Sequence, residues 1–94
     1  MVLNIGFGTI GAGQWQRWWY RINNGADLGP RYAMANPFNP GGELESHHQT
    51  KKKEGDGTIT YWVWVRNIGS VTTNFNLQVG GLTGSPKLSW RDEK

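Results

Sequence analysis

Apolar and polar residues alternate with a period of two along much of this chain, and glycines and prolines are spread between the alternating stretches. No window of helical length shows the 3.6-residue periodicity of an amphipathic helix. Successive side chains of a strand point to opposite faces, so the alternation is typical of strands that bury one face. About seven short strands separated by turns predict an all-β fold, either a small antiparallel β-sandwich or a flattened barrel.

The length of the chain predicts one domain. Its 94 residues are close to the size of a single typical domain, and we expect a sandwich over residues 1–90 followed by a charged tail over residues 91–94. Six Trp, three Tyr and three Phe argue against disorder. The absence of Cys excludes a disulfide framework, a thiolate metal site and a cysteine nucleophile.

Charge and hydropathy restrict the compartment and the partners. No apolar run approaches the ~20 residues that a membrane-spanning helix needs, so no transmembrane segment is expected. The first residues lack the basic start and long apolar stretch of a secretion signal, so the chain either works where it is made or is a processed secreted form. The net charge of +3 is small, which disfavours nucleic acid as a partner.

The strand predicted over residues 14–22 has two unlike faces. Trp18, Tyr20 and Ile22 share one face, which we assign to the core. Two interpretations of the other face stay open: its indoles cover the glycines of a neighbouring strand with guanidinium groups stacked between them, or they bind a ligand. The residues of this second face are Trp15, Arg17, Trp19 and Arg21.

The strand predicted over residues 58–66 places two more indoles outside the core. Its apolar face carries Ile59, Tyr61, Val63 and Val65, so Trp62 and Trp64 point the other way. An exposed apolar patch with a polar rim usually marks an interaction site. We therefore expect a partner or ligand to cover these two rings.

Turn signals on both sides of this strand predict its neighbours. A hairpin at residues 67–69 would place Thr72 and Asn74 opposite Trp64 and Trp62, and a two-residue turn at residues 56–57 would place Gln49 opposite Trp64. The second register is the weaker one, since it directs Thr50 and His48 toward the core and a bulge would change it. The predicted ligand-binding residues are therefore Trp62, Trp64, Asn74, Thr72, Gln49 and Arg66, together with Trp15 and Trp19.

The segment Tyr61-Trp62-Val63-Trp64-Val65-Arg66-Asn67-Ile68-Gly69-Ser70, which runs on to Phe75-Asn76-Leu77, resembles a hairpin of bacterial Ig-like domains of the cell-adhesion-related group. The resemblance covers residues 58–79 and implies a sandwich with a binding role. It implies no particular ligand residues. The two outward indoles depart from the usual polar outer face of such a hairpin.

The first strand supplies a glycine motif that we interpret structurally. Residues 6–11 match G-x-G-x-x-G, but an alternating strand follows instead of the helix that a dinucleotide cofactor needs, so no cofactor is expected. We expect Phe7 to face the core opposite Trp18, and Trp19 to cover Gly6. Trp90, near the end of the chain, is expected to fill the core.

No catalytic or metal constellation emerges. His47 and His48 are adjacent, and adjacent strand residues point to opposite faces, so we expect that the two rings cannot chelate together and that no metal site is present. Two His and four Ser lack the context of a nucleophilic triad. The chain is therefore not expected to be an enzyme.

The preferred function is a lectin-like module that binds carbohydrate. Sugars present flat C–H faces to indoles and hydroxyls to the flanking amide and cationic groups. The first alternative is a self-assembling protein that uses the indoles as an oligomer interface, since Trp and Arg are enriched in interface hot spots. The second is single-stranded nucleic acid binding by stacking along a basic groove.

Overall fold

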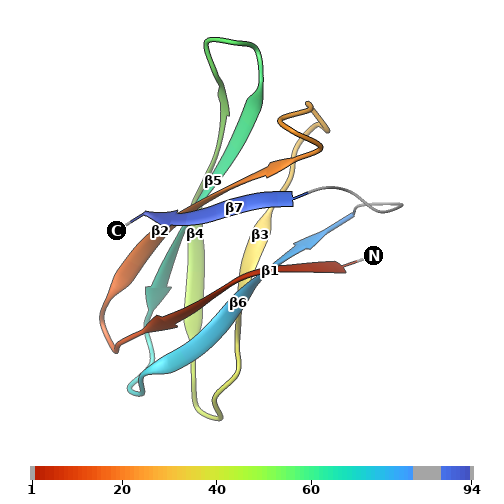
Figure 1. Cartoon of the computed structure of the whole chain (residues 1–94). Coiled ribbons are helices and arrows are strands. Elements are labelled where there is room, and N and C mark those ends of the chain that lie inside the picture. Colours follow the sequence, from red (N-terminus) through yellow and green to blue (C-terminus); the bar gives the residue numbers. More distant parts are fainter. Residues whose placement is uncertain (1, 82–87, 94) are drawn as a thin grey trace.

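The computed structural model describes residues 2–81 and 88–93, which form seven strands in two antiparallel sheets (Figure 1). The sheets do not close into a barrel, so the expected sandwich is confirmed. Lys87 and Lys94, which the sequence placed in the last strand and in the tail, lie outside the described residues. The strands are β1 (Val2–Ile10), β2 (Trp15–Ile22), β3 (Ala33–Pro37), β4 (Leu44–Lys53), β5 (Ile59–Asn67), β6 (Thr73–Gly80) and β7 (Leu88–Glu93).

The strand order shows that neighbours in sequence mostly lie in different sheets. One sheet has the order β1-β6-β3 and the other β4-β5-β2-β7. The turns β1–β2 and β5–β6 therefore cross between the sheets, and the predicted pairings of the first strand with the second and of residues 58–66 with 71–79 are wrong. The reason is that two apolar faces can be buried against each other across the sandwich as well as side by side in one sheet.

Asn67, the last residue of β5, stabilises the crossing from β5 to β6. Its buried side-chain amide donates to the carbonyl oxygens of Ile10 (2.9 Å) and Val71 (2.8 Å), and its Oδ1 accepts from the backbone N–H of Gly69 (3.0 Å). One side chain thus ties the crossing loop to the end of β1.

The core lies between the sheets and contains the apolar faces that the alternation predicts. Trp18 is buried there, and its ring makes an edge-to-face contact with that of Phe75 at a centroid distance of 5.8 Å. The buried apolar residues are Ile5, Ile10, Trp18, Tyr20, Ile22, Ala33, Ala35, Ile59, Tyr61, Val63, Val65, Phe75, Leu77 and Val79.

The expected orientation of Phe7 is wrong, because β1 contains a bulge. The register with β6 shifts between Ile5 and Phe7, and Gly6 adopts a φ of 64°. The shift turns Phe7 outward, where 73% of it is exposed. Trp18, not Trp19, covers Gly6: a Cβ built on Gly6 would lie 2.5 Å from Cζ3 of Trp18.

Trp90 does not fill the core. It is 44% exposed on β7, at the edge of the four-stranded sheet, and its ring centroid lies 6.3 Å from that of Trp18. An edge strand has a neighbour on one side only, so its side chains are covered less completely than those of a central strand.

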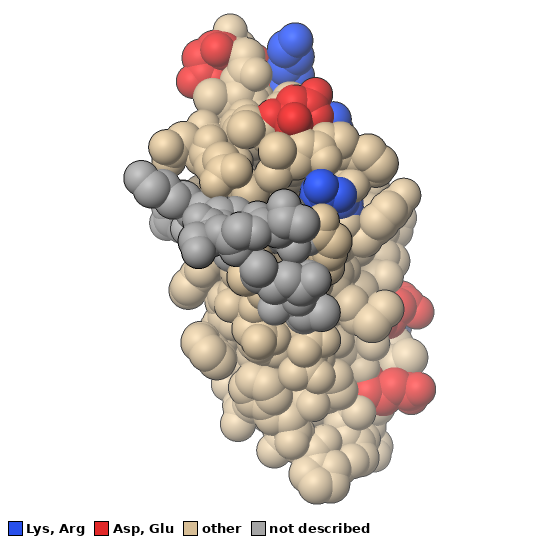
Figure 2. Space-filling model, turned by 90° about the vertical axis from the view of Figure 1, so that its right-hand side faces the viewer, with Lys and Arg blue, Asp and Glu red and all other residues tan. Residues whose placement is uncertain are grey.

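Both signs of charge lie near the end of the molecule that holds the β4–β5 turn. Figure 2 shows them there on one face, with two further acidic groups lower on its right side. Two ion pairs lie there: Lys51 Nζ to Asp27 Oδ1 (2.6 Å) and Lys52 Nζ to Glu54 Oε1 (3.3 Å). The polar β4 is an edge strand of the four-stranded sheet. Among the described residues, no helix could cross a membrane.

Candidate ligand-binding site

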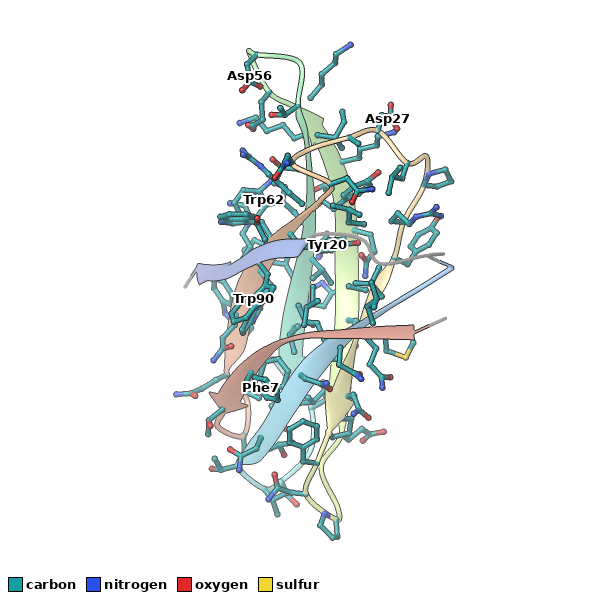
Figure 3. All side chains as sticks on the ribbon, turned by 45° about the vertical axis from the view of Figure 1, so that its right-hand side comes forward. Phe7, Tyr20, Asp27, Asp56, Trp62 and Trp90 are labelled. Atoms are coloured by element: carbon teal, nitrogen blue, oxygen red, sulfur yellow. The ribbon has the colours of Figure 1, made fainter. Side chains whose placement is uncertain are left out.

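The outer face of β2 and β5 collects the four candidate indoles. Trp19 lies opposite Trp62 in the β2–β5 ladder, and Trp15 lies opposite Arg66. Figure 3 shows Trp62 pointing away from the interior, whereas Tyr20 points into it. We call this surface the indole face; its residues are Trp15, Arg17, Trp19, Arg21, Trp62, Trp64 and Arg66.

One part of the indole face is covered by its own arginines. The guanidinium carbon of Arg17 lies 3.7 Å from the ring centroid of Trp62, and that of Arg21 lies 5.6 Å from the ring of Trp19. Arg21 Nε also donates to Thr60 Oγ1 at 3.0 Å. These cation–π contacts agree with the expected stacking of guanidinium groups on the indoles of this face and extend it to Trp62. The expected cover of glycines by Trp19 is wrong, because β2 lies between β5 and β7 and not beside β1.

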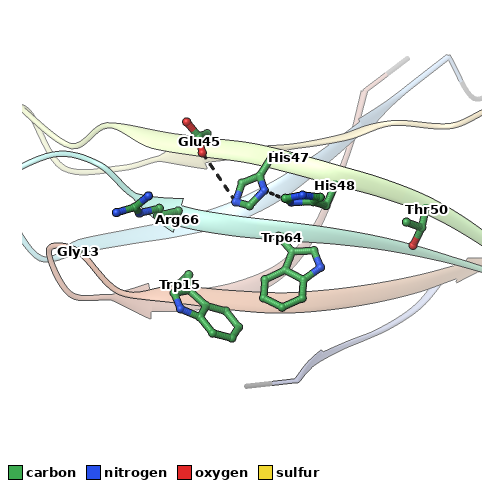
Figure 4. Close-up of a pocket in the computed structure, with 8 residues that line it drawn as sticks. All are labelled: Gly13, Trp15, Glu45, His47, His48, Thr50, Trp64 and Arg66. Atoms are coloured by element: carbon green, nitrogen blue, oxygen red, sulfur yellow. Dashed lines mark hydrogen bonds and ion pairs between the residues drawn. The ribbon is translucent and has the colours of Figure 1, made fainter.

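The other part of the indole face opens into a hollow. Trp15 and Trp64 pack ring to ring there, with centroids 4.5 Å apart and planes inclined by 37°, and 52% of Trp15 remains exposed. The hollow measures about 1060 Å³ (Figure 4). It is lined by Gly13, Trp15, Glu45, His47, His48, Thr50, Trp64 and Arg66.

A bulge in β4 forms one wall of the hollow and overturns two expectations. The β4–β5 register shifts between His47 and Thr50, so His47 lies opposite Trp64, where Gln49 was expected, and Thr50 lies opposite Trp62. His48, at the bulge, has a φ of 52°. The two histidine rings consequently contact each other through their Nδ1 atoms, although regular strand geometry predicts opposite faces.

Gln49 turns inward and joins the two sheets. Its Nε2 donates to the carbonyl oxygen of Ala33 at 2.9 Å, and its Oε1 accepts from the N–H of Ala33 at 3.4 Å. Ser46 Oγ accepts from the N–H of Ala35 at 2.8 Å in the same way. Gln49 therefore satisfies the free edge of β3 and does not border the indoles.

Asn74 and Thr72 do not line the hollow either. Asn74 lies on β6, in the other sheet, where its Oδ1 accepts from Thr9 Oγ1 at 2.7 Å. Thr72 is exposed just before β6 begins. Both were assigned to the site through the hairpin pairing that the strand order overturns.

Sequence reasoning missed several residues of the hollow, namely Gly13, Glu45, Thr50 and the two histidines as a pair. The sequence does contain one signal for them. A regular register directs the polar side chains of Thr50 and His48 toward the core, and a bulge in the strand removes this conflict by shifting the register. Glu45 Oε1 lies 3.7 Å from His47 Nε2 and approaches the ring from the side opposite His48.

Searches of family models, curated proteins and solved structures find no match to this chain. Within residues 2–81 and 88–93, no cluster of three or more His, Asp or Glu side chains is arranged to hold a metal ion.

Proposed function

We propose that this protein is a non-enzymatic, lectin-like module that binds carbohydrate in the hollow beside Trp15 and Trp64. The observation that supports this proposal most is the pair of indoles, 4.5 Å apart, at the open part of an otherwise polar hollow. Indole rings provide a flat apolar surface for the C–H face of a sugar ring. The ligand-binding residues are thus Trp15, Trp64, Arg66 and the polar residues around them.

The polar groups of the hollow suit hydroxyl-bearing ligands. Arg66 supplies donors only, Glu45 supplies acceptors when ionised, and Thr50 supplies both. Sugar hydroxyls donate and accept, so they can use every group in this mixture. The volume of about 1060 Å³ is at the upper end of the range for small-molecule sites and leaves room for one or two sugar rings.

Nucleic acid fits this surface less well. Arg17 and Arg21, the cations nearest the centre of the indole face, are already engaged by Trp62 and by Thr60. Glu45 in the hollow would repel a phosphate. Self-association through the exposed Trp15 remains the alternative, and a sizing measurement distinguishes the two functions.

The arrangement of the sheets supports the further proposal that the sandwich is Ig-like. In a constant-type Ig domain one sheet contains strands A, B, E and D and the other C, F and G. In this chain, β2, β5 and β4 lie side by side in the order of strands B, E and D, and β3 lies beside β6 as strand C lies beside F. The positions of the edge strands A and G are taken by β7 and β1, so the two terminal strands are exchanged relative to that pattern.

The proposed function is tested by screening a glycan panel and titrating any hit by calorimetry. We expect Trp64→Ala and Trp15→Ala each to weaken binding at least tenfold, because each removes half of the stacking surface. Trp90→Ala is the matched control, an exposed indole on β7 outside the hollow, and it should leave the affinity unchanged. Absence of any binding glycan, or equal losses in all three variants, contradicts the proposal.

A further inference from the structure

The outer face of the three-stranded sheet carries an aromatic pair that the proposed function does not use. Phe7 on β1 and Phe38, which follows β3, flank the central strand β6, and their ring centroids lie 6.4 Å apart with planes inclined by 52°. Both rings are open to solvent, with 73% of Phe7 and 49% of Phe38 exposed. The bulge at Gly6 turns Phe7 to this side, and bulges often re-aim side chains at functional sites.

Amide side chains on the same face are joined in pairs between neighbouring strands. Nδ2 of Asn36 donates to Oδ1 of Asn76 at 3.0 Å, and Nε2 of Gln78 donates to Oδ1 of Asn4 at 3.2 Å. Each pair uses the donor end of one amide and the acceptor end of the other. The opposite ends retain a carbonyl oxygen and an amide donor in each pair, and a sugar hydroxyl can bind to either.

The charge of this face restricts what it can bind. Over the residues that the structure assigns to them, β1, β3 and β6 contain no Asp, Glu, Lys or Arg. A nucleic acid needs cations for its phosphates, and a dry protein interface would bury amide groups that need partners. A neutral saccharide supplies hydroxyls for the amides and C–H faces for the rings. We propose that the outer face of the three-stranded sheet binds a chain of neutral sugar units.

The length of the face indicates more than one sugar unit. Phe38 donates its backbone N–H to the carbonyl oxygen of Asn74 at 2.8 Å, so Asn74 marks the end of β6 beside the aromatic pair. Gln78 lies four residues farther along β6, which is about 13 Å. A single sugar ring is shorter than this span. One unit therefore stacks on Phe7 and Phe38, and the following units reach the amides of Gln78 and Asn4.

This surface is separate from the hollow. The residues that line the hollow lie on β2, β4 and β5 or in the β1–β2 turn, and none lies on β1, β3 or β6. The proposal therefore does not rest on the carbohydrate site beside Trp15 and Trp64, and each site can be tested while the other is intact.

The test is an NMR titration of the whole chain with cellohexaose, xylohexaose and mannohexaose in turn, and with hexagalacturonate as the acidic comparison. We expect at least one neutral hexasaccharide to shift the side-chain signals of the face in a saturable way, and hexagalacturonate to bind more weakly because its carboxylates meet no cation there. Gln49 and Asn67, whose amides bond to the backbone elsewhere, should not shift. The signals that should shift are those of Phe7, Phe38, Asn4, Asn36, Asn76 and Gln78.

Variants show whether the aromatic pair carries the binding. Phe7→Ala and Phe38→Ala should each weaken the affinity measured from these amide signals about tenfold. Both side chains are exposed, so their truncation should not unfold the chain. Trp64→Ala in the hollow and Ile68→Ala, an exposed apolar residue in the β5–β6 crossing, should leave that affinity unchanged.

The outcomes separate this site from the hollow. Saturable shifts of the amides that both Phe variants weaken support the proposal, whether or not the signals of Trp15 and Trp64 also move. The proposal is overturned if no saccharide shifts the amides, if the Phe variants bind like the wild type, or if hexagalacturonate binds as tightly as the neutral chains. It is also overturned if the same amide signals change with protein concentration alone, because the face would then be an interface between two copies.

Discussion

The guanidinium carbon of Arg17 lies 3.7 Å from the ring centroid of Trp62, on the neighbouring strand. Arg17 pairs with Trp64 in the β2–β5 ladder, but its guanidinium carbon is farther from the ring centroid of Trp64, at 5.9 Å. The contact occupies one face of Trp62 and leaves the Trp15–Trp64 pair as the open part of the indole face. The sequence favoured Trp62 and Trp64 as the binding pair. The structure favours Trp64 and Trp15 instead, farther along the same sheet.

We expect this contact to contribute to stability. A guanidinium over an indole is worth about 0.5–2 kcal/mol. A double-mutant cycle of Arg17→Met and Trp62→Leu, followed by urea denaturation, should give a coupling energy in that range. Arg17→Met retains the aliphatic stem and removes the charge. Strictly additive effects of the two substitutions would contradict the cation–π assignment.

Gly6→Ala should be strongly destabilising, because Gly6 combines a φ of 64° with a close approach to Trp18. A Cβ there would lie 2.5 Å from Cζ3 of Trp18, so the substitution should cost about 2–5 kcal/mol of the free energy of unfolding. Gly13→Ala is the matched control: its φ is 79° and nothing lies within 4 Å of a built Cβ. We expect about 1–2 kcal/mol there. If chemical denaturation gave the same loss of unfolding free energy for both variants, the close contact between Gly6 and Trp18 would not contribute to the cost.

Asn67→Ala should also be costly. The substitution leaves the carbonyl oxygen of Ile10 and the N–H of Gly69 without their side-chain partner, and it removes one of the two side-chain donors to the carbonyl oxygen of Val71, which keeps Thr73 Oγ1. Unsatisfied buried groups cost about 1–3 kcal/mol each. We expect a loss of about 2–4 kcal/mol in urea denaturation. Asn74→Ala, which removes one exposed hydrogen bond, should cost less than about 1 kcal/mol. Similar costs for the two variants would refute the role of Asn67 in the β5–β6 crossing.

Acid should weaken the fold partly through two exposed carboxylates. Hydrogen bonds from the side chain and backbone of Thr58 hold the pKa of Asp56 below its usual value, and the hydrogen bond from Lys51 does the same to the pKa of Asp27. Since these pKa values are lower in the folded than in the unfolded chain, the stabilisation is present above about pH 4 and is lost as the pH falls below that value.

The acid effect is measured as the change in thermal midpoint between pH 6 and pH 3. Asp56→Asn keeps an acceptor oxygen for Thr58 but cannot be protonated, so its midpoint should fall less than that of the wild type. A fall of equal size in the variant would mean that Asp56 plays no part in the acid response.

The success and failure of sequence prediction on this chain have one physical origin. Alternation decides which face of a strand is buried, and it correctly placed Trp15, Trp19, Trp62 and Trp64 outside the core. It does not decide which strand lies beside which. Asn74 was assigned through a strand pairing and lies in the other sheet.

Bulges account for most of the remaining errors. One extra residue in a strand reverses the direction of the side chains that follow, and the sequence marks this only weakly. The bulge at Gly6 turned Phe7 outward, and the bulge at His48 turned Gln49 inward and brought His48 against His47. The hollow depends on the second bulge, so it could not be derived from alternation alone.

The most direct test of the binding proposal is an NMR titration that follows the indole N–H signals of the six Trp residues with a glycan selected from the panel. The account predicts that the signals of Trp15 and Trp64 shift in a saturable way, while those of the buried Trp18 and of Trp90 stay in place. Saturable shifts confined to other indoles, or no shift with any glycan, would contradict a carbohydrate site in the hollow.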